Sequence, residues 1–328
     1  MNLRFGKTQP VNLVIKDHVI RYVDAKGTNL QSVKAFGERY LQTGWVRDGK
    51  ISDREHVEAV LEECVDTWKL KNRDVNFIVP DSTVLFKKLS IPNDIPDDEI
   101  KGYLYFEIGT TIHLPFEDPI FDFYVLGQKD EKKEILLFGA PEQIINDYTE
   151  LLEDVKLTPK VADISPLCTY RLYHALDLFV REEHLLLLQI SIGSISLSIF
   201  HEEKPVFMRN IHVSSDEVLW SNKINDQGEF SVVCEDIDKM KGNLKDNLME
   251  IERVVNFYKF SINQGKAGIT KTFLTGDHPY LSYIKEQLDS TTGMQSATFT
   301  DHVFETIKGE IVPTQFYLPL SLVLKEVK

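Results

Sequence analysis

Residues 185–211 are the most strongly patterned part of the chain in their sequence of apolar and polar positions. Residues 185–190 form an apolar run that is typical of a buried strand, and residues 194–200 place apolar side chains and serines on opposite faces. Residues 205–211 return after a charged turn. The pattern predicts three strands joined by two tight turns.

The first of these turns, residues 191–194, contains Gly193 together with the hydroxyl residues Ser191 and Ser194. A glycine and small hydroxyls in a turn between strands can expose backbone N–H groups to a phosphate. The same residues also suit an ordinary hairpin. The pattern leaves a phosphate site and a simple turn as alternatives.

The N-terminal part of the chain changes from strand-like alternation to helical spacing. Ser52 and Glu55 form a capping box ahead of apolar residues that share one helical face. The strands expected around this helix are 11–15, 19–23, 29–36 and 75–79. Three strands, a helix and a further strand predict a sheet that is covered by helices.

Residues 84–160 have the pattern of a separate small unit. A strand at 84–91 precedes a helix that Asp97 can cap. A hairpin within 120–138 then precedes a helix whose first turn holds Pro141. This order predicts a compact α+β subdomain inserted into the first lobe.

The rest of the chain repeats the order of the first part. The further elements expected are a strand at 160–165, helices at 166–179 and around 215–225, 235–241 and 245–262, a strand at 272–275, and helices at 280–288 and 317–327. The patterns together predict an α/β fold in which two lobes face a ligand cleft. The predicted division is a first lobe of residues 1–83 and 161–184, an inserted subdomain of 84–160, and a second lobe of 185–328.

Composition narrows the class of protein. The chain has 328 residues, of which 42% are hydrophobic and 27% charged, and its net charge is −14. Such values are ordinary for a globular protein. The negative charge argues against nucleic acid and against unaided binding to anionic lipid, because both need clustered lysine and arginine. Cys64, Cys168 and Cys234 are far apart, so we expect buried free thiols, and neither a signal peptide nor a membrane-spanning segment is expected.

Motifs of common enzymes are absent from the sequence. Gly6-Lys7-Thr8 resembles the end of a Walker loop but lacks the glycine and the strand that would precede it. No zinc-protease, nucleophile-elbow or paired-cysteine motif occurs. Histidines such as His113 are scattered, and we expect no metal site and no acid–base pair.

Several segments, each weak alone, occur in an order and spacing that resemble one family. Examples are WVRDGKISD at 45–53 and FDFYVL at 121–126. The other segments are 89–92, Glu107, 113–116, 161–164, 205–211, 252–258 and 273–276. Over nearly its whole length the chain is similar to the PilM family of type IV pilus assembly proteins, which are relatives of the cell-division protein FtsA. The resemblance implies a two-lobed actin-like ATPase fold with the small subdomain inserted into the first lobe.

The resemblance also marks the positions that hold the nucleotide in those family members that bind ATP. They carry an Asp-Ile-Gly-Ser/Thr loop between their first two strands, where this chain has VIKDH at 14–18. Gln189 and Ser191 stand in place of Asp and Gly in the second phosphate loop. The degenerate cleft positions are Lys16, Asp17, Gln189, Ser191, Gly193, Ser194, Gly276 and Asp277.

These departures weaken a nucleotide site for physical reasons. Asp17 would repel a phosphate, and the neutral Gln189 is a poor partner for Mg²⁺. Lys16 could supply a charge to a phosphate or could be a turn lysine in solvent. We therefore expect no cofactor, no metal and no enzymatic activity. The alternative is an ATP-binding or ATP-hydrolysing actin-like protein that holds ATP with Mg in the cleft.

The resemblance implies a peptide partner. PilM-like proteins bind the short cytoplasmic N-terminal segment of PilN, a bitopic inner-membrane protein, in a groove between the first lobe and the inserted subdomain. The candidate groove residues here are Val84, Phe86, Leu89, Tyr103, Phe106, Glu107, Phe121 and Phe123. The aromatic residues could equally be core residues.

The implied function is that of a non-catalytic cytoplasmic scaffold of type IV pilus or related secretion assembly. The resemblance places such a scaffold at the inner face of the cytoplasmic membrane through its partner, without direct membrane insertion. Other pilus assembly components could also bind, and the sequence leaves self-assembly open.

Overall fold

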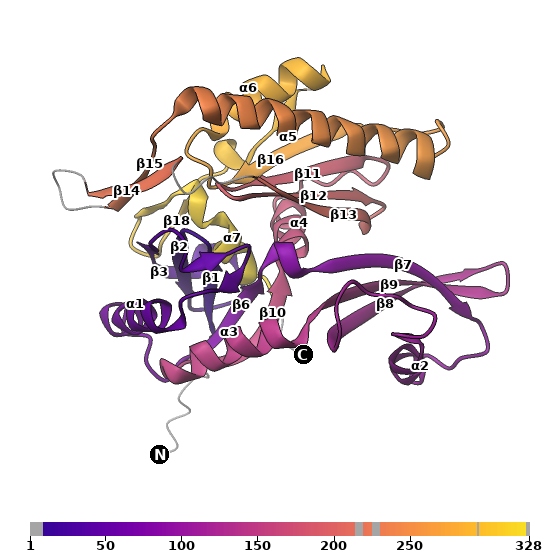
Figure 1. Ribbon diagram of the computed structural model, residues 1–328, viewed down its shortest axis with the longest axis horizontal. Coiled ribbons are helices and arrows are strands. Elements are labelled where there is room, and N and C mark those ends of the chain that lie inside the picture. Colours follow the sequence, from indigo (N-terminus) through magenta and orange to yellow (C-terminus); the bar gives the residue numbers. More distant parts are fainter. Residues whose placement is uncertain (1–8, 214–218, 225–229, 294, 326–328) are drawn as a thin grey trace.

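The computed structural model describes residues 9–213, 219–224, 230–293 and 295–325. Two five-stranded sheets lie one above the other, and a three-stranded sheet extends to one side of the lower one (Figure 1). The lower sheet belongs to the first lobe, the upper sheet to the second lobe, and the small sheet to the inserted subdomain.

The first lobe contains a sheet with the strand order β10-β6-β1-β2-β3. Its strands are β1 (Val11–Lys16), β2 (Val19–Ala25), β3 (Val33–Tyr40), β6 (Asp74–Val79) and β10 (Thr158–Ile164). β1 and β2 form an antiparallel hairpin, whereas β6 pairs in parallel with both β1 and β10. The alternation in the sequence therefore located these strands, although β3 begins later than the predicted residue 29 because a 3-10 turn, Leu30–Ser32, precedes it.

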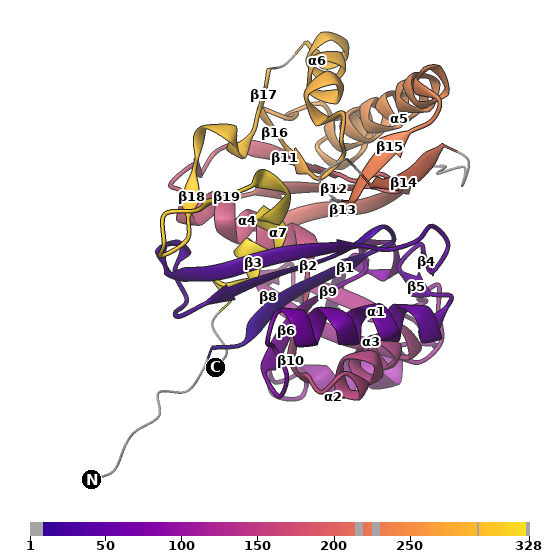
Figure 2. The same cartoon turned by 90° about the vertical axis from the view of Figure 1, so that its left-hand side faces the viewer.

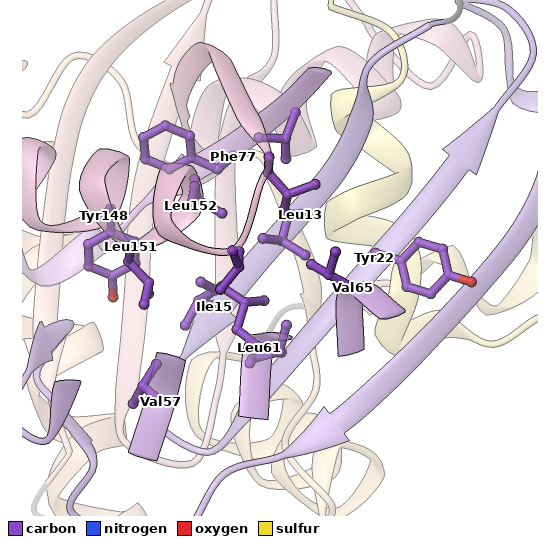
Figure 3. Packing of buried hydrophobic residues seen from close by; sticks show 14 of the residues in the cluster. Leu13, Ile15, Tyr22, Val57, Leu61, Val65, Phe77, Tyr148, Leu151 and Leu152 are labelled. Atoms are coloured by element: carbon purple, nitrogen blue, oxygen red, sulfur yellow. The ribbon is translucent and has the colours of Figure 1, made fainter. Parts of the chain in front are cut away.

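Two helices pack on one face of this sheet. They are α1 (Arg54–Thr67) and α3 (Glu142–Asp154). Figure 3 shows Leu61 of α1 and Tyr148 of α3 in one buried cluster with Leu13 and Phe77 of the sheet. The predicted boundaries place α3 with the inserted subdomain, but its buried face belongs to the core of the first lobe.

The predicted capping box at Ser52 is wrong by one residue. Asp53 is the N-cap of α1, and its Oδ1 accepts a hydrogen bond from the His56 backbone N–H at 3.3 Å. A short hairpin of β4 (Val46–Arg47) and β5 (Lys50–Ile51) precedes the helix. Ser52 and Asp53 are both residue types that cap helices, and here Asp53 occupies the N-cap position.

The inserted subdomain has a small sheet with the order β7-β9-β8. Its elements are β7 (Leu85–Pro92), α2 (Ile100–Glu107), β8 (Pro119–Lys129) and β9 (Lys132–Pro141). Ile100 and Leu104 of α2 pack on Ile135 and Leu137 of the sheet. The prediction that Asp97 caps α2 is wrong. Glu99 is at the N-cap, and the Asp97 carboxylate instead accepts a hydrogen bond from Lys133 Nζ at 2.6 Å.

The second lobe contains a sheet with the order β13-β12-β11-β16-β17. Its strands are β11 (His184–Ile190), β12 (Ser194–His201), β13 (Lys204–His212), β16 (Lys271–Gly276) and β17 (Ser296–Ala297). α5 (Ile237–Phe257) and α6 (Leu281–Thr292) pack on its outer face. The three strands predicted within 185–211 are confirmed.

Two helix predictions in the second lobe are wrong. The helices predicted at 235–241 and 245–262 are one helix, α5, followed by a π-helical turn, Tyr258–Ile262. The predicted helix around 215–225 contains instead β14 (Trp220–Ile224), which pairs with β15 (Phe230–Cys234), and residues 215–218 and 225 of this prediction lie outside the described ranges. Trp220 packs with Met240 of α5, a distant contact that sequence periodicity does not reveal.

Two helices lie between the large sheets (Figure 2). They are α4 (Ser165–Ala175) and α7 (Tyr317–Leu322), and α7 is shorter than the predicted helix at 317–327. Tyr173 and Leu320 belong to a buried cluster that also contains Val23 of the first lobe and Phe273 of the second. A short hairpin, β18 (Phe304–Glu305) and β19 (Ile311–Val312), borders the same cluster. One continuous hydrophobic core therefore joins the two lobes.

Two expectations from composition can be compared with the structure. Cys64, Cys168 and Cys234 are free and buried, as predicted. Within the described residues, no helix combines the length and the apolar character that crossing a membrane requires.

Candidate functional site

The β1–β2 turn faces the second lobe across the cleft. Lys16 Nζ lies 2.7 Å from Ser191 Oγ and 2.9 Å from Asp277 Oδ1. The Ser191 hydroxyl also donates to Asp277 Oδ1 at 2.8 Å. Lys16 ends β1, Ser191 follows β11 and Asp277 follows β16, so these contacts join segments of the two lobes that are far apart in the sequence.

Asp277 has two further partners that sequence reasoning missed. Arg21 donates through Nη1 to Asp277 and through Nε to Glu38, the latter at 2.7 Å, and His18 Nε2 lies 3.3 Å from Asp277. The Arg21 side chain is 4% exposed and that of Asp277 2% exposed. A charged residue within the apolar strand β2 was the available signal for Arg21. We call Lys16, His18, Arg21, Ser191 and Asp277 the cleft cluster.

The neighbouring cations determine the protonation state of Asp277 in the cleft cluster. Burial alone would raise the pKa of Asp277, but Lys16, Arg21 and His18 together hold that pKa well below its ordinary value. Burial lowers the pKa of the neighbouring His278 to about 4. Asp277 is therefore an ionised carboxylate that the protein's own cations neutralise, and His278 is neutral near pH 7.

Gly276 directs Asp277 into the cleft. Its φ is +131°, and a Cβ at this position would lie 2.0 Å from the carbonyl oxygen of Ile190. The close approach allows the N–H groups of Asp277 and His278 to donate to the Ile190 oxygen at 3.1 and 3.2 Å. Glycine is required here by this contact between strands, independently of any ligand.

Asp17 and Gln189 have structural partners away from Asp277. Asp17 accepts hydrogen bonds from the backbone N–H groups of Asp48 and Gly49 at 2.8 and 2.9 Å, and burial raises its pKa. Gln189 Oε1 lies 2.9 Å from Ser165 Oγ, which also contacts Asp81 at 2.6 Å. Burial raises the pKa of Asp81, a carboxyl at the end of β6 that sequence reasoning did not single out.

One cavity in the cleft measures about 60 Å³. Its lining contains Lys16, His18 and Ser191 of the cleft cluster together with Asp17, Asp81, Gly193 and Ser194. Ligand pockets commonly measure about 300–1,000 Å³, so this space suits a few water molecules. A second hollow, of about 20 Å³, lies beside His278, whose ring is 5.3 Å from that of Trp220.

A much larger hollow lies at the inserted subdomain. It measures about 870 Å³ and follows the chain from the end of α2 to the start of β8. We call it the β8 groove. Its apolar lining residues are Tyr105, Ile108, Leu114, Pro115, Phe116, Pro119, Ile120 and Phe121, and its charged lining residues are Glu117, Asp118 and Glu142, with His113 beside them.

A family model described as type IV pilus assembly protein PilM matches residues 14–316. The chain belongs to the PilM family. A search among curated proteins finds no match.

Solved structures confirm the actin-like fold of this family member. A PilM-PilN type IV pilus biogenesis complex matches with a TM-score of 0.75 and 19% identity, over 97% of this chain and 98% of that chain. The ethanolamine utilization protein EutJ from Carboxydothermus hydrogenoformans matches with a TM-score of 0.50 and 10% identity, over 96% and 89%. A Bacteroides thetaiotaomicron protein with an actin-like ATPase fold matches with a TM-score of 0.50 and 10% identity, over 98% and 97%.

The groove residues predicted from the PilM family do not form one surface. Leu89, Tyr103 and Phe123 pack in the subdomain core below α2. Phe121 belongs to this core and also lines the β8 groove, where its ring lies 4.8 Å from Tyr105. Core packing thus accounts for several of the predicted aromatic residues.

The other predicted groove residues lie apart from this core. Phe86 packs against Phe138, with ring centroids 5.4 Å apart, and Val84 lies between a 3-10 turn and β7. The carboxylate of Glu107 contacts the Thr111 hydroxyl. Phe106 is 81% exposed on α2. The prediction missed the loop between α2 and β8, whose apolar residues are spaced irregularly and carry no periodic signal.

Proposed function

We propose that this chain is a non-catalytic scaffold of type IV pilus assembly that binds the short N-terminal cytoplasmic segment of a PilN-like inner-membrane protein. One observation carries the proposal: the open volume is about 870 Å³ in the β8 groove and about 60 Å³ in the cleft between the lobes. The chain therefore offers a partner far more space at the inserted subdomain than at the nucleotide position.

The β8 groove has the chemistry of a peptide site. Its floor is apolar, and β8 is an edge strand of the small sheet, which gives an extended peptide backbone groups to pair with. Glu117, Asp118 and Glu142 place negative charge at the groove. An N-terminal segment carries an α-ammonium group, so its charge complements these carboxylates.

The cleft cluster supports the non-catalytic part of the proposal. A nucleotide phosphate at this position would have to displace Asp277 from Lys16 and Arg21 and would meet a buried carboxylate. The removal of a buried carboxylate from its cations carries a large electrostatic cost. The protein's own carboxylate thus supplies the negative charge that a nucleotide would bring to these cations.

The same proposal gives the location of the protein. A cytoplasmic chain would reach the inner face of the membrane by holding the cytoplasmic end of a membrane-anchored partner. This agrees with the finding that no described helix is suited to cross a bilayer.

Peptide binding tests the groove. A fluorescein-labelled peptide with the N-terminal sequence of the PilN-like protein from the same genome is titrated with the full chain, alongside a scrambled peptide. Tyr105→Ala removes a 60% exposed ring from the groove, and Phe260→Ala removes an equally exposed ring from the second lobe. We expect Tyr105→Ala alone to weaken binding. Equal binding of the scrambled peptide, or equal loss in Phe260→Ala, would contradict the proposal.

Nucleotide binding tests the cleft. The melting temperature of the chain is followed during titration with Mg-ATP, since a ligand that binds the native state raises it. We expect no saturable shift. A saturable rise would favour the alternative of an ATP-binding actin-like protein.

A further inference from the structure

An exposed aromatic and basic surface lies at the C-terminal end of α5. Figure 1 shows α5 along the outer face of the second lobe, with this end at the periphery of the molecule. Phe257 is 48% exposed, Phe260 60% and Ile262 42%. We call these three residues, together with the exposed Lys259 and Lys266, the α5 tip.

The π-helical turn holds the α5 tip in a defined orientation. Tyr258 is buried, and its hydroxyl lies 2.6 Å from His184 Nδ1 at the start of β11. The backbone carbonyl of Tyr258 accepts from the Asn263 side chain at 3.2 Å, and that of Lys259 accepts from the Gly265 N–H at 2.8 Å. With Tyr258 directed inward, Phe260 remains outside, whereas the half-exposed Phe257 packs on Phe207 of β13, with ring centroids 6.0 Å apart.

The local charge at the tip is opposite to that of the whole chain. Residues 253–271 contain four lysines and arginines and no carboxylate, in a chain of net charge −14. Arg253 is paired with Glu250 at 3.1 Å and Lys271 with Glu183 at 3.7 Å. Among the ion pairs of the described residues, none involves Lys259 or Lys266, and Lys259 Nζ lies 5.1 Å from the centre of the Phe260 ring.

A structural role accounts for only part of this surface. Lysine near the last turn of a helix is favoured by the helix dipole, which is sufficient reason for Lys259. That effect does not explain two exposed phenylalanines and an exposed isoleucine beside it. An apolar surface that lysines surround suits a shallow position in the headgroup region of a bilayer, with the lysine ammonium groups at the phosphates.

We propose that the α5 tip is a weak binding site for the surface of an anionic phospholipid membrane. The α5 tip has only a few exposed side chains, whereas a stable protein interface buries about 800 Å² on each side. A few inserted side chains with adjacent lysines are enough for electrostatic attraction to anionic lipid, so we favour lipid over a protein partner. The negative charge of the whole chain opposes membrane binding at long range, but screening limits that repulsion to about 8–10 Å at physiological salt.

The inference stands independently of the proposed peptide partner. It concerns another lobe and needs no residue of the β8 groove. If both sites act together, the membrane-anchored partner raises the effective concentration of lipid at the tip, so a weak site contributes more than its own affinity suggests.

Vesicle flotation with the purified full chain, without any partner, tests the proposal. The vesicles are phosphatidylcholine alone, or phosphatidylcholine with phosphatidylglycerol, at low and high salt. We expect binding to the anionic vesicles at low salt and its loss at high salt or on neutral vesicles. The absence of any difference between the two lipid compositions would overturn the proposal.

Two pairs of variants locate the contact. Lys259→Glu/Lys266→Glu should lower binding by at least about tenfold, whereas Lys101→Glu/Lys308→Glu makes the same change in net charge at exposed positions elsewhere. Phe260→Ser should also lower binding, and Phe106→Ser is its control on a residue that is 81% exposed. Equal loss in the control variants would overturn the proposal. The proposal would also be overturned if the tip variants abolished self-association, as measured by light scattering, and left vesicle binding unchanged.

Discussion

The cleft between the lobes and the β8 groove differ in how their charges are neutralised and in the volume of their cavities. In the cleft, Lys16 and Arg21 face the buried Asp277, and the cavity beside them measures about 60 Å³. In the groove, carboxylates line an open apolar hollow and face no described lysine or arginine within its lining. The cleft thus satisfies its charges internally, whereas the groove leaves both charge and apolar surface for a partner.

We expect the largest effect from removal of the buried Asp277 carboxylate. Asp277→Ala leaves Lys16 and Arg21 without their shared partner in a desolvated site. We expect a loss of about 3–5 kcal/mol in the free energy of unfolding, measured by urea denaturation. Asp98→Ala, at an exposed position, is the control and should change stability by less than about 0.5 kcal/mol. An Asp277→Ala protein of normal stability would show that the cleft cluster does not hold the lobes together.

A substitution at Gly276 tests how the carboxylate reaches the cleft. The added Cβ of Gly276→Ala would lie 2.0 Å from the Ile190 carbonyl oxygen, so β16 or the loop must move. We expect a loss of about 2–3 kcal/mol in the free energy of unfolding. Gly102→Ala, inside α2 with no atom within 4 Å of the added Cβ, should be neutral or stabilising. Equal behaviour of the two variants would argue against a required close approach.

The pH dependence of stability sharpens the description of the cleft. Because burial lowers the pKa of His278 to about 4, the folded chain binds fewer protons at this group than the unfolded chain between about pH 4 and 6.5. Stability from this group is therefore present above pH 6.5 and is lost as pH falls toward 4. Urea denaturation at several pH values should show that the free energy of unfolding falls by about 2–3 kcal/mol over this range. This fall should be absent in His278→Gln. An unchanged slope in the variant would assign the effect to other groups.

The smallest effect concerns the charge of the groove. Glu117→Gln removes one carboxylate from the β8 groove, whereas Glu131→Gln removes one from the β8–β9 turn outside it. We expect only Glu117→Gln to weaken binding of the PilN-like peptide, by about 0.5–1 kcal/mol, and to reduce its dependence on salt. Fluorescence anisotropy at two salt concentrations measures both. Salt-independent binding of the original chain would remove the charge argument and leave an apolar groove.

Local patterns predicted much of the fold and less of the two sites. The strands within 185–211 and the hairpin at the N-terminus were located because alternation over a few residues already specifies them. The strand β14, which contains Trp220, was predicted as part of a helix. Local pattern could not locate it, because Trp220 packs with the distant residues Met240 and His278. The degenerate cleft positions were identified by resemblance, but the role of Arg21 was not.

The sequence by itself determined most of the order of the elements and, through the family resemblance, the actin-like fold. It also showed that the family's glycine and carboxylate pattern for phosphate and metal is absent from this chain. Tertiary structure alone decided that Lys16 and Asp277, which are 261 residues apart, form one cluster. It also decided that the loop before β8, together with Tyr105 and Phe121, lines the open groove, whereas Leu89, Tyr103 and Phe123 pack in the subdomain core. The reason is that periodicity and capping act over one or two turns of chain, whereas ion pairing and open volume depend on which distant segments the fold brings together.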